Sequence, residues 1–203
     1  MPDRANAAGT VRWTVVVPVK GTSSAKSRLG AVPELATAIA LDSVEAALGA
    51  ADVLVVTSAT LAAEFFALGA GVALDAGGGL LAACAQGIEA AGAGPVAVML
   101  GDIPALRPAE LARALELAVG HPRAFVADAD DDGTVLITAL DPTGHVPAFG
   151  PHSRANHRAA GYVELDLPSD SGLRRDVDTA EQLRAIPVTS LGPRTAAALE
   201  RLT

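Results

Sequence analysis

The sequence predicts an α/β fold with a mixed, mostly parallel central sheet flanked by helices. Up to Gly120, apolar β-branched runs alternate with helical segments, which is the pattern of βα units around a buried parallel sheet. Beyond that point Asp132 and Gly133 separate two strand-like runs and predict a hairpin, which adds an antiparallel part. Half of the 203 residues are hydrophobic, enough for the core of one compact domain.

The elements of the parallel part follow one another in a regular order. Each expected strand is an apolar run, and the first expected helix carries apolar residues at helical spacing. Pro33 and Pro108 favour helix starts, because the first helical residue needs no N–H. We expect strands at 14–19, 52–57, 72–74 and 96–100, and helices at 33–48, 61–68, 80–91 and 108–119.

The second half of the chain predicts a different order of elements. Asp178 and Glu181 have the spacing of a capping box at the start of one helix. Ser190–Thr203 has the pattern of an amphipathic helix, which we expect to pack on its own domain. We expect strands at 124–127, 134–140 and 162–165, helices at 153–160 and 179–185, a disordered leader at 1–12 and a single domain at 13–203.

The composition excludes several kinds of partner. Lys and Arg number 15 against 23 Asp and Glu, and the net charge of −8 disfavours duplex nucleic acid. An aromatic content of 3% leaves few stacking surfaces for single strands. No apolar run approaches the roughly 20 residues of a membrane span, so we expect no membrane partner. The single cysteine, Cys84, cannot form an internal disulfide, which favours a cytoplasmic location.

Polar segments follow three of the expected strands, at 20–28, 75–79 and 101–104. Ligands of such sheets bind outside the carboxyl ends of the strands, so the three segments can converge on one crevice. The first segment is not a P-loop, because Lys20 and Ala25 stand where that motif needs glycine, and no G-x-G-x-x-G fingerprint follows the first strand. Its cations suit a triphosphate, although an ordinary solvated loop has the same composition; they are Lys20, Lys26 and Arg28.

Two aspartates are candidate metal ligands. Asp102 ends a buried apolar strand in the sequence Gly-Asp-Ile-Pro, where a carboxylate can hold Mg²⁺ against phosphates, and a turn-capping aspartate is the alternative. Asp176 is the expected second ligand, because the capping box occupies Asp178. Asp178 remains the alternative, since residues two apart share one face of a strand.

The segment Phe149–Ser153 predicts a tight turn into a short helix. Such a helix start, with the hydroxyl of Ser153 and free N–H groups, can hold a phosphate or carboxylate, and plain N-capping by Ser153 is the alternative. The segment Asp128–Asp132 predicts a solvated turn. His152 and His157 are candidate bases, but we expect surface positions for both. We expect packing roles for Trp13, Phe65, Phe66 and Cys84.

Several motifs occur in a fixed order: VPVKGTSSAKSRL, GDIPAL, DGT, FGPHSRANH and DVDTAEQL. Together they resemble the phosphoenolpyruvate and 2-phospho-L-lactate guanylyltransferases of coenzyme F420 biosynthesis, which belong to the wider molybdenum-cofactor type of nucleotidyltransferase. The resemblance covers Trp13–Ile186. VPVK followed by AKSRL is specific to the guanylyltransferases, whereas G-D-x-P and D-x-D-T are shared with the wider superfamily.

The resemblance implies a Rossmann-like nucleotidyltransferase fold of the glycosyltransferase-A type. It implies an enzyme that joins GTP to a small phosphorylated carboxylic acid, releases pyrophosphate and hands its product to the next transferase of the pathway. The implied residue roles are Mg²⁺ binding by Asp102 and Asp176; contact with the GTP phosphates and catalysis by Lys20, Lys26 and Arg28; nucleotide contact at Gly79; and binding of the acceptor by Thr134, Gly150 and Ser153.

One departure from the family concerns the nucleotide. Relatives often carry Asn where this chain has Leu81, which leaves the base preference open. Phosphoenolpyruvate is the expected acceptor, with 2-phospho-L-lactate and 3-phosphoglycerate as alternatives. A molybdenum-cofactor-type nucleotidyltransferase is disfavoured by VPVK and AKSRL, and a non-catalytic nucleotide-binding module by the retained Asp102, Asp176, Lys20 and Lys26.

Overall fold

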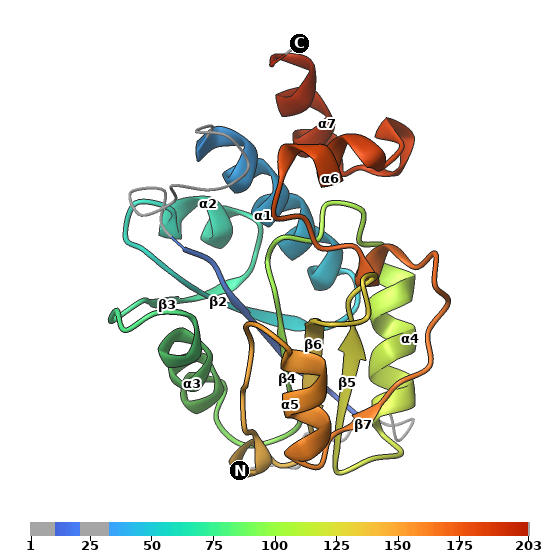
Figure 1. Ribbon diagram of the computed structural model, residues 1–203. Helices are drawn as coiled ribbons and strands as arrows, with labels where there is room; N and C mark the ends of the chain where they lie inside the picture. The colour runs from blue at the N-terminus through green and yellow to red at the C-terminus, as the bar shows by residue number, and fades with distance from the viewer. Residues whose placement is uncertain (1–10, 21–32, 203) are drawn as a thin grey trace.

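Seven strands form one sheet in the part of the chain that the computed structural model describes, residues 11–20 and 33–202 (Figure 1). The strand order is β3-β2-β1-β4-β6-β5-β7. The strands are β1 (Thr14–Pro18), β2 (Asp52–Thr57), β3 (Gly71–Leu74), β4 (Val96–Met99), β5 (Arg123–Ala127), β6 (Thr134–Ala139) and β7 (Val163–Glu164).

Strand β6 is the antiparallel member of this sheet. It pairs antiparallel with both β4 and β5, whereas β1, β2, β3 and β4 run parallel to one another and β7 runs parallel to β5. The amino end of β6 therefore lies beside the carboxyl end of β4, where the N–H of Leu100 donates to the carbonyl of Val135 at 3.0 Å. The single-domain α/β fold expected from the sequence is confirmed, and β7 is shorter than expected.

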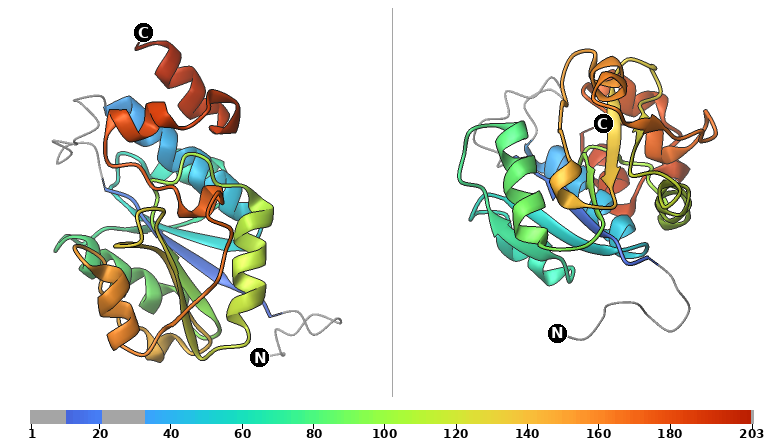
Figure 2. Two further views of the ribbon diagram at one scale, coloured as in Figure 1. Left: turned by 45° about the vertical axis from the view of Figure 1, so that its right-hand side comes forward. Right: turned by 90° about the horizontal axis from the view of Figure 1, so that it is seen from below.

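Helices cover both faces of the sheet (Figure 2). Val15 and Val17 of β1 face a core shared with α1, α2 and α4, whereas Val16 faces a second core with α3, because strand side chains alternate between the faces. The helices are α1 (Pro33–Leu48), α2 (Ala62–Ala67), α3 (Leu80–Ala91), α4 (Pro108–Ala118), α5 (Ser153–Ala159), α6 (Ala180–Ala185) and α7 (Pro193–Glu200), with 3₁₀ turns at Pro142–Gly144, Gly172–Arg174 and Val188–Ser190.

Asp42 fastens the C-terminal helix α7 to α1. Its Oδ2 accepts hydrogen bonds from the backbone N–H and the hydroxyl of Thr195, both at 2.7 Å. Its Oδ1 accepts one from the guanidinium of Arg194 at 3.1 Å. Ala198 and Leu199 of α7 pack in a core cluster with Leu35 of α1. The expectation that this helix packs on its own domain is confirmed.

Two local expectations are wrong. The capping box of α6 is formed by Thr179 and Gln182, one residue later than expected, so Asp178 does not cap the helix with its carboxylate. Phe66 is 74% exposed, because it lies on the outer side of the short helix α2, whereas its neighbour Phe65 is fully buried. Trp13 and Cys84 are buried, as expected.

Among the helices described within residues 33–202, none is long and apolar enough to cross a bilayer.

We predict that Asp42→Ala lowers the free energy of unfolding by about 3 kcal/mol, because it leaves the buried N–H and hydroxyl of Thr195 without an acceptor. Urea denaturation followed by circular dichroism measures the change. Asp52→Ala is the matched control, since it removes an exposed ion pair with Arg12 and is expected to leave the unfolding midpoint unchanged. Equal midpoints for the two variants would contradict the role given to Asp42.

Candidate active site

The expected site residues gather at one edge of the sheet. Lys20 lies two residues beyond β1 and is exposed, and Asp102 lies three residues beyond β4. Thr134 opens β6 at the same edge, because β6 runs antiparallel to β4. Lys26 and Arg28 lie outside the described residues, so their contact with phosphates stays a prediction.

The glycine-rich turn after β3 leads into α3 with an open helix start. Gly77, Gly78 and Gly79 have φ angles of 89°, 98° and 87°, which L-residues with a side chain rarely adopt. Gly79 is the N-cap of α3, and no side chain caps the first N–H groups of that helix in the described structure. Leu81, in the first turn of α3, is 47% exposed. A bare helix start beside the sheet edge can receive an anion or a polar edge of a nucleotide.

A backbone hydrogen bond brings the two candidate metal ligands together. The N–H of Val177 donates to the carbonyl of Asp102 at 3.0 Å, so the segment that carries Asp176 runs directly past the end of β4. One oxygen of Asp102, Oδ1, is buried and has no hydrogen-bond partner among the described residues. Asp176 is half-buried, whereas Asp178 is exposed. Burial, and not the capping argument, therefore favours Asp176 over Asp178.

Both candidate metal ligands, Asp102 and Asp176, have a raised pKa. Burial, with a second contribution from the neighbouring carboxylate of Asp176, raises the pKa of Asp102 to about 7. Burial likewise raises the pKa of Asp176 to about 6, with a second contribution from the carboxylate of Asp128. Clustered carboxylates with an orphaned buried oxygen are stabilised when a cation binds between them.

The residues present fit a hard divalent cation in donor type. In the described ranges no group of three or more His, Cys, Asp or Glu side chains forms a metal cluster. A pair of carboxylates is nevertheless sufficient for Mg²⁺, which commonly takes one or two protein carboxylates and fills its other positions with water and substrate phosphates.

Thr134, Gly150 and Ser153, which the resemblance assigns to the acceptor, lie on two segments that meet: the N–H of Arg154 donates to the carbonyl of Asp132 at 3.1 Å. Gly150 has a φ of 126° and open space where a Cβ would stand, so its backbone can be approached closely. The N–H of Ser153 donates to the carbonyl of Gly150 at 3.1 Å. Ser153 is the first residue of α5 and is buried, and His152 occupies the N-cap position. Plain N-capping by Ser153 is therefore excluded, and so is a free backbone N–H at this residue.

A buried histidine underlies these three residues. His157 of α5 is fully buried, which corrects the expectation of a surface position, whereas His152 is exposed as expected. The hydroxyl of Thr134 lies 3.0 Å from Nδ1 of His157. Burial lowers the pKa of His157 to about 4, so the imidazole is neutral near pH 7.

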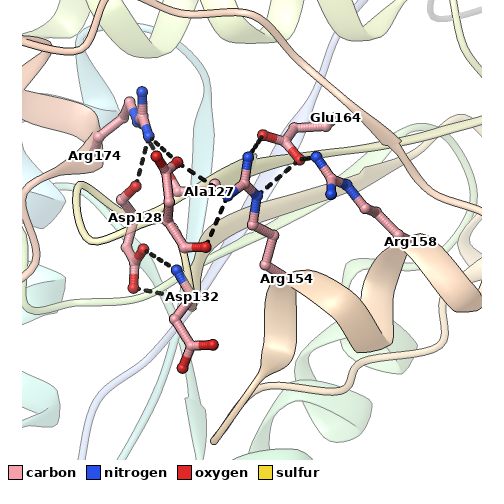
Figure 3. A network of polar contacts seen from close by, with 9 residues as sticks. Ala127, Asp128, Asp132, Arg154, Arg158, Glu164 and Arg174 are labelled. Atoms are coloured by element: carbon pink, nitrogen blue, oxygen red, sulfur yellow. Dashed lines mark hydrogen bonds and ion pairs between the residues drawn. The ribbon is translucent and has the colours of Figure 1, made fainter.

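Arginines hold the acidic 128–133 turn in place (Figure 3). Arg174 donates to the carbonyls of Ala127 and Asp128 and to the carboxylate of Asp131. Arg154 donates to the carbonyl of Asp131, and its guanidinium also pairs with Glu164. The turn is thus tied to α5 on one side and to the segment before Asp176 on the other.

The expectation of a solvated turn at Asp128–Asp132 holds only in part. Asp130 is exposed, whereas the carboxylate of Asp128 turns inward and accepts from the N–H groups of Asp132 at 3.1 Å and Gly133 at 2.8 Å. Gly133 is needed for this turn, because a Cβ there would stand 2.2 Å from Oδ2 of Asp128. The glycine in the DGT motif was a signal for this inward carboxylate.

A mixed sheet with a glycine turn and paired carboxylates at its edge is the arrangement of a nucleotide-dependent transferase. Residues 34–185 match the family model described as a MobA-like NTP transferase domain. The chain is 50% identical over 207 residues to a phosphoenolpyruvate guanylyltransferase of Streptomyces coelicolor, covering 95% of this chain and 98% of the relative.

The chain therefore belongs to the MobA-like NTP transferase family, and it is a nucleotidyltransferase. The resemblance drawn from the sequence motifs is confirmed.

Solved structures with the same fold agree with this class. A Methanothermobacter nucleotidyl transferase superposes with a TM-score of 0.65 at 22% identity, covering 88% of this chain and 97% of that one. Rv0371c of Mycobacterium tuberculosis, solved in complex with manganese, superposes with a TM-score of 0.55 at 19% identity, covering 87% and 97%.

We predict that acid destabilises the protein partly through His157. Its pKa is about 6.5 in an unfolded chain and about 4 in the fold, so the stability it contributes is complete above pH 6.5 and is lost as the pH falls toward 4. Between about pH 7.5 and 4.5 the wild type should lose roughly 2 kcal/mol of unfolding free energy more than His157→Gln loses.

Urea unfolding at both pH values measures this difference. His145, whose pKa is also lowered by burial, is present in both proteins, so its contribution cancels. Identical pH dependence in the two proteins would show that His157 is not buried in neutral form.

Proposed function

We propose that this chain transfers the guanylyl group of GTP to phosphoenolpyruvate. A phosphate oxygen of phosphoenolpyruvate attacks the α-phosphorus of GTP, the bond from that phosphorus to the β-phosphate oxygen breaks, and pyrophosphate leaves. The products are enolpyruvyl-diphospho-guanosine and pyrophosphate. The observation that carries this proposal is the 50% identity, over 95% of the chain, to a relative named for this reaction.

The acceptor needs no protein nucleophile, because its phosphate is already ionised near neutral pH. The protein's task is to position two anionic substrates and to compensate their charge. Lys20, with Lys26 and Arg28 a few residues further along the sequence, would face the GTP phosphates, and the open start of α3 at Gly79 would lie against the nucleotide.

Asp102 and Asp176 would hold Mg²⁺. The buried oxygen of Asp102 without a partner and the shared raised pKa of the two carboxylates support this assignment. Bound Mg²⁺ would neutralise charge on the GTP phosphates during the displacement. A protein of the same fold, Rv0371c, is named as a manganese complex, so a divalent ion is known in a protein of this fold.

The acceptor would lie between the carboxylate pair and the start of α5. Thr134 would supply a hydroxyl, Gly150 an open backbone surface, and Ser153 a second hydroxyl. We further propose that the reaction takes place in the cytoplasm and that its product passes to the next transferase of coenzyme F420 biosynthesis.

The experiment that tests this function offers one substrate pair at a time. Purified protein with Mg²⁺ receives GTP, CTP or ATP together with phosphoenolpyruvate, 2-phospho-L-lactate or 3-phosphoglycerate. Pyrophosphate release and product mass are followed, with the downstream transferase and its own acceptor present in a parallel tube because the product can be labile. We expect turnover with GTP and phosphoenolpyruvate.

Other outcomes of this experiment would change the assigned acceptor, the nucleotide or the reaction itself. Turnover with 2-phospho-L-lactate or 3-phosphoglycerate in place of phosphoenolpyruvate would correct the acceptor. Turnover with CTP or ATP would correct the nucleotide and point to Leu81 at the α3 start, where relatives often carry Asn. A folded protein that binds GTP but releases no pyrophosphate in any tube would contradict the proposal and favour a nucleotide-binding module.

We predict that Asp102→Asn and Asp176→Asn each slow turnover by about 10²–10³-fold, because each removes a carboxylate ligand of the Mg²⁺ that would compensate the negative charge of the transition state. Initial rates of pyrophosphate release at saturating substrates measure the effect. Asp178→Asn is the matched control: its side chain is exposed in the same short segment, and its rate should stay close to that of the wild type. If Asp178→Asn is the slow variant and Asp176→Asn is not, the second metal ligand is Asp178.

A further inference from the structure

The ring of His157 lies in a cage of three aromatic side chains. Phe149 and Tyr162 meet it edge to face, each with ring centroids 5.3 Å apart, and Phe125 lies at 6.1 Å. The side chain is fully buried. Packing of this kind fixes the ring plane, so both ring nitrogens point in set directions.

Each ring nitrogen has a hydrogen-bond partner, and the partners determine where the proton is. The backbone N–H of Ala148 donates to Nε2 at 2.9 Å, so Nε2 carries a lone pair. A neutral imidazole must then carry its proton on Nδ1, which lies 3.0 Å from Oγ1 of Thr134. Nδ1–H donates to Oγ1 of Thr134, and the backbone carbonyl of Ser153 is a second acceptor for the ring. The hydroxyl of Thr134 therefore keeps its own proton for another acceptor.

Through these contacts His157 is connected to all three residues that the proposed function assigns to binding of the acceptor. Thr134 at the start of β6 is bound directly. Ala148 lies two residues before Gly150, so the bond to Nε2 anchors the turn. Ser153 lies one helical turn before His157 on α5, and its N–H donates to the carbonyl of Gly150.

We infer that His157 is the positioning residue of the acceptor site: its Nδ1–H tautomer orients the Thr134 hydroxyl toward an anionic oxygen of the phosphorylated acid while Nε2 holds the turn at Gly150. This inference rests on the proposed function. His157 does not itself touch the substrate or the reacting atoms. It acts on affinity for the acceptor, and it has no contact with the glycine turn or the carboxylate pair among the described residues.

Two substitutions test the roles of the two ring nitrogens of His157 separately. His157→Gln can keep an acceptor for the N–H of Ala148 but loses the donor to Thr134, whereas His157→Asn can keep a donor near Thr134. We expect His157→Gln to raise the KM for phosphoenolpyruvate by about 10- to 100-fold with the KM for GTP changed by less than about 2-fold. His157→Asn should restore part of that loss.

Thr134→Val and the double variant complete a cycle with His157→Gln. If His157 acts through Thr134, the double variant has about the same KM for phosphoenolpyruvate as the worse single variant. Thr138→Val is the matched control, because Thr138 lies on the same strand, is fully buried and donates to the carbonyl of Ala124 at 3.2 Å. It should leave both KM values unchanged at a temperature where all variants are folded by circular dichroism.

An ¹⁵N spectrum of histidine-labelled full-length protein tests the tautomer without turnover. We expect a protonated Nδ1 and an unprotonated Nε2 for His157, and the opposite assignment would overturn the inference. So would multiplicative effects in the cycle, or an unchanged KM for phosphoenolpyruvate in His157→Gln while the wild type is active. A wild type with no turnover of phosphoenolpyruvate would instead remove the proposed function, and the inference with it.

Discussion

The hydrogen bond from the N–H of Val177 to the carbonyl of Asp102 joins two parts of the chain that are far apart in sequence. Asp102 comes from the carboxyl end of β4, in the middle of the sheet, and Asp176 comes from the irregular segment that leads to α6. Burial and neighbouring carboxylates raise the pKa of both side chains, so their charged forms are costly without a cation. The pair therefore favours binding of a cation. The backbone hydrogen bond keeps the two segments together despite the cost of burying two carboxylates.

The two sides of the site are constructed differently. The side that we propose for the nucleotide consists of the segment after β1, which carries Lys20, and the glycine turn before α3, whose backbone is open and uncapped. The side that we propose for the acceptor has many hydrogen bonds: Arg174 and Arg154 hold the 128–133 turn, and His157 ties β6 to α5 from within the core. A small acceptor that differs from its analogues by a hydroxyl or a double bond requires such fixed geometry, because discrimination comes from satisfied or unsatisfied polar groups.

Local patterns predicted most of the fold. The bounds of α1, β2 and α3 match their expected ranges, because proline starts, apolar runs and the glycine turn are signals within a few residues of the element. Asp102, Thr134 and Gly150 stand in short motifs and are site candidates for the same reason. His157 was missed because its cage is formed by Phe125, Phe149 and Tyr162, whose convergence depends on the sheet order and on no local pattern. The cap of α6 was misplaced by one residue, because Asp178 and Thr179 are both good N-cap residues and only the folded chain selects between them.

A crystal structure with Mg²⁺, phosphoenolpyruvate and a GTP analogue that has a methylene bridge between the α- and β-phosphates tests the central claim most directly. The account predicts a metal ion bound by Asp102 and Asp176, a nucleotide along the glycine turn, and the acid of the acceptor on Thr134, Gly150 and Ser153 with its phosphate facing the α-phosphorus. A metal ion bound away from both carboxylates, or an acceptor bound at another edge of the sheet, would contradict it.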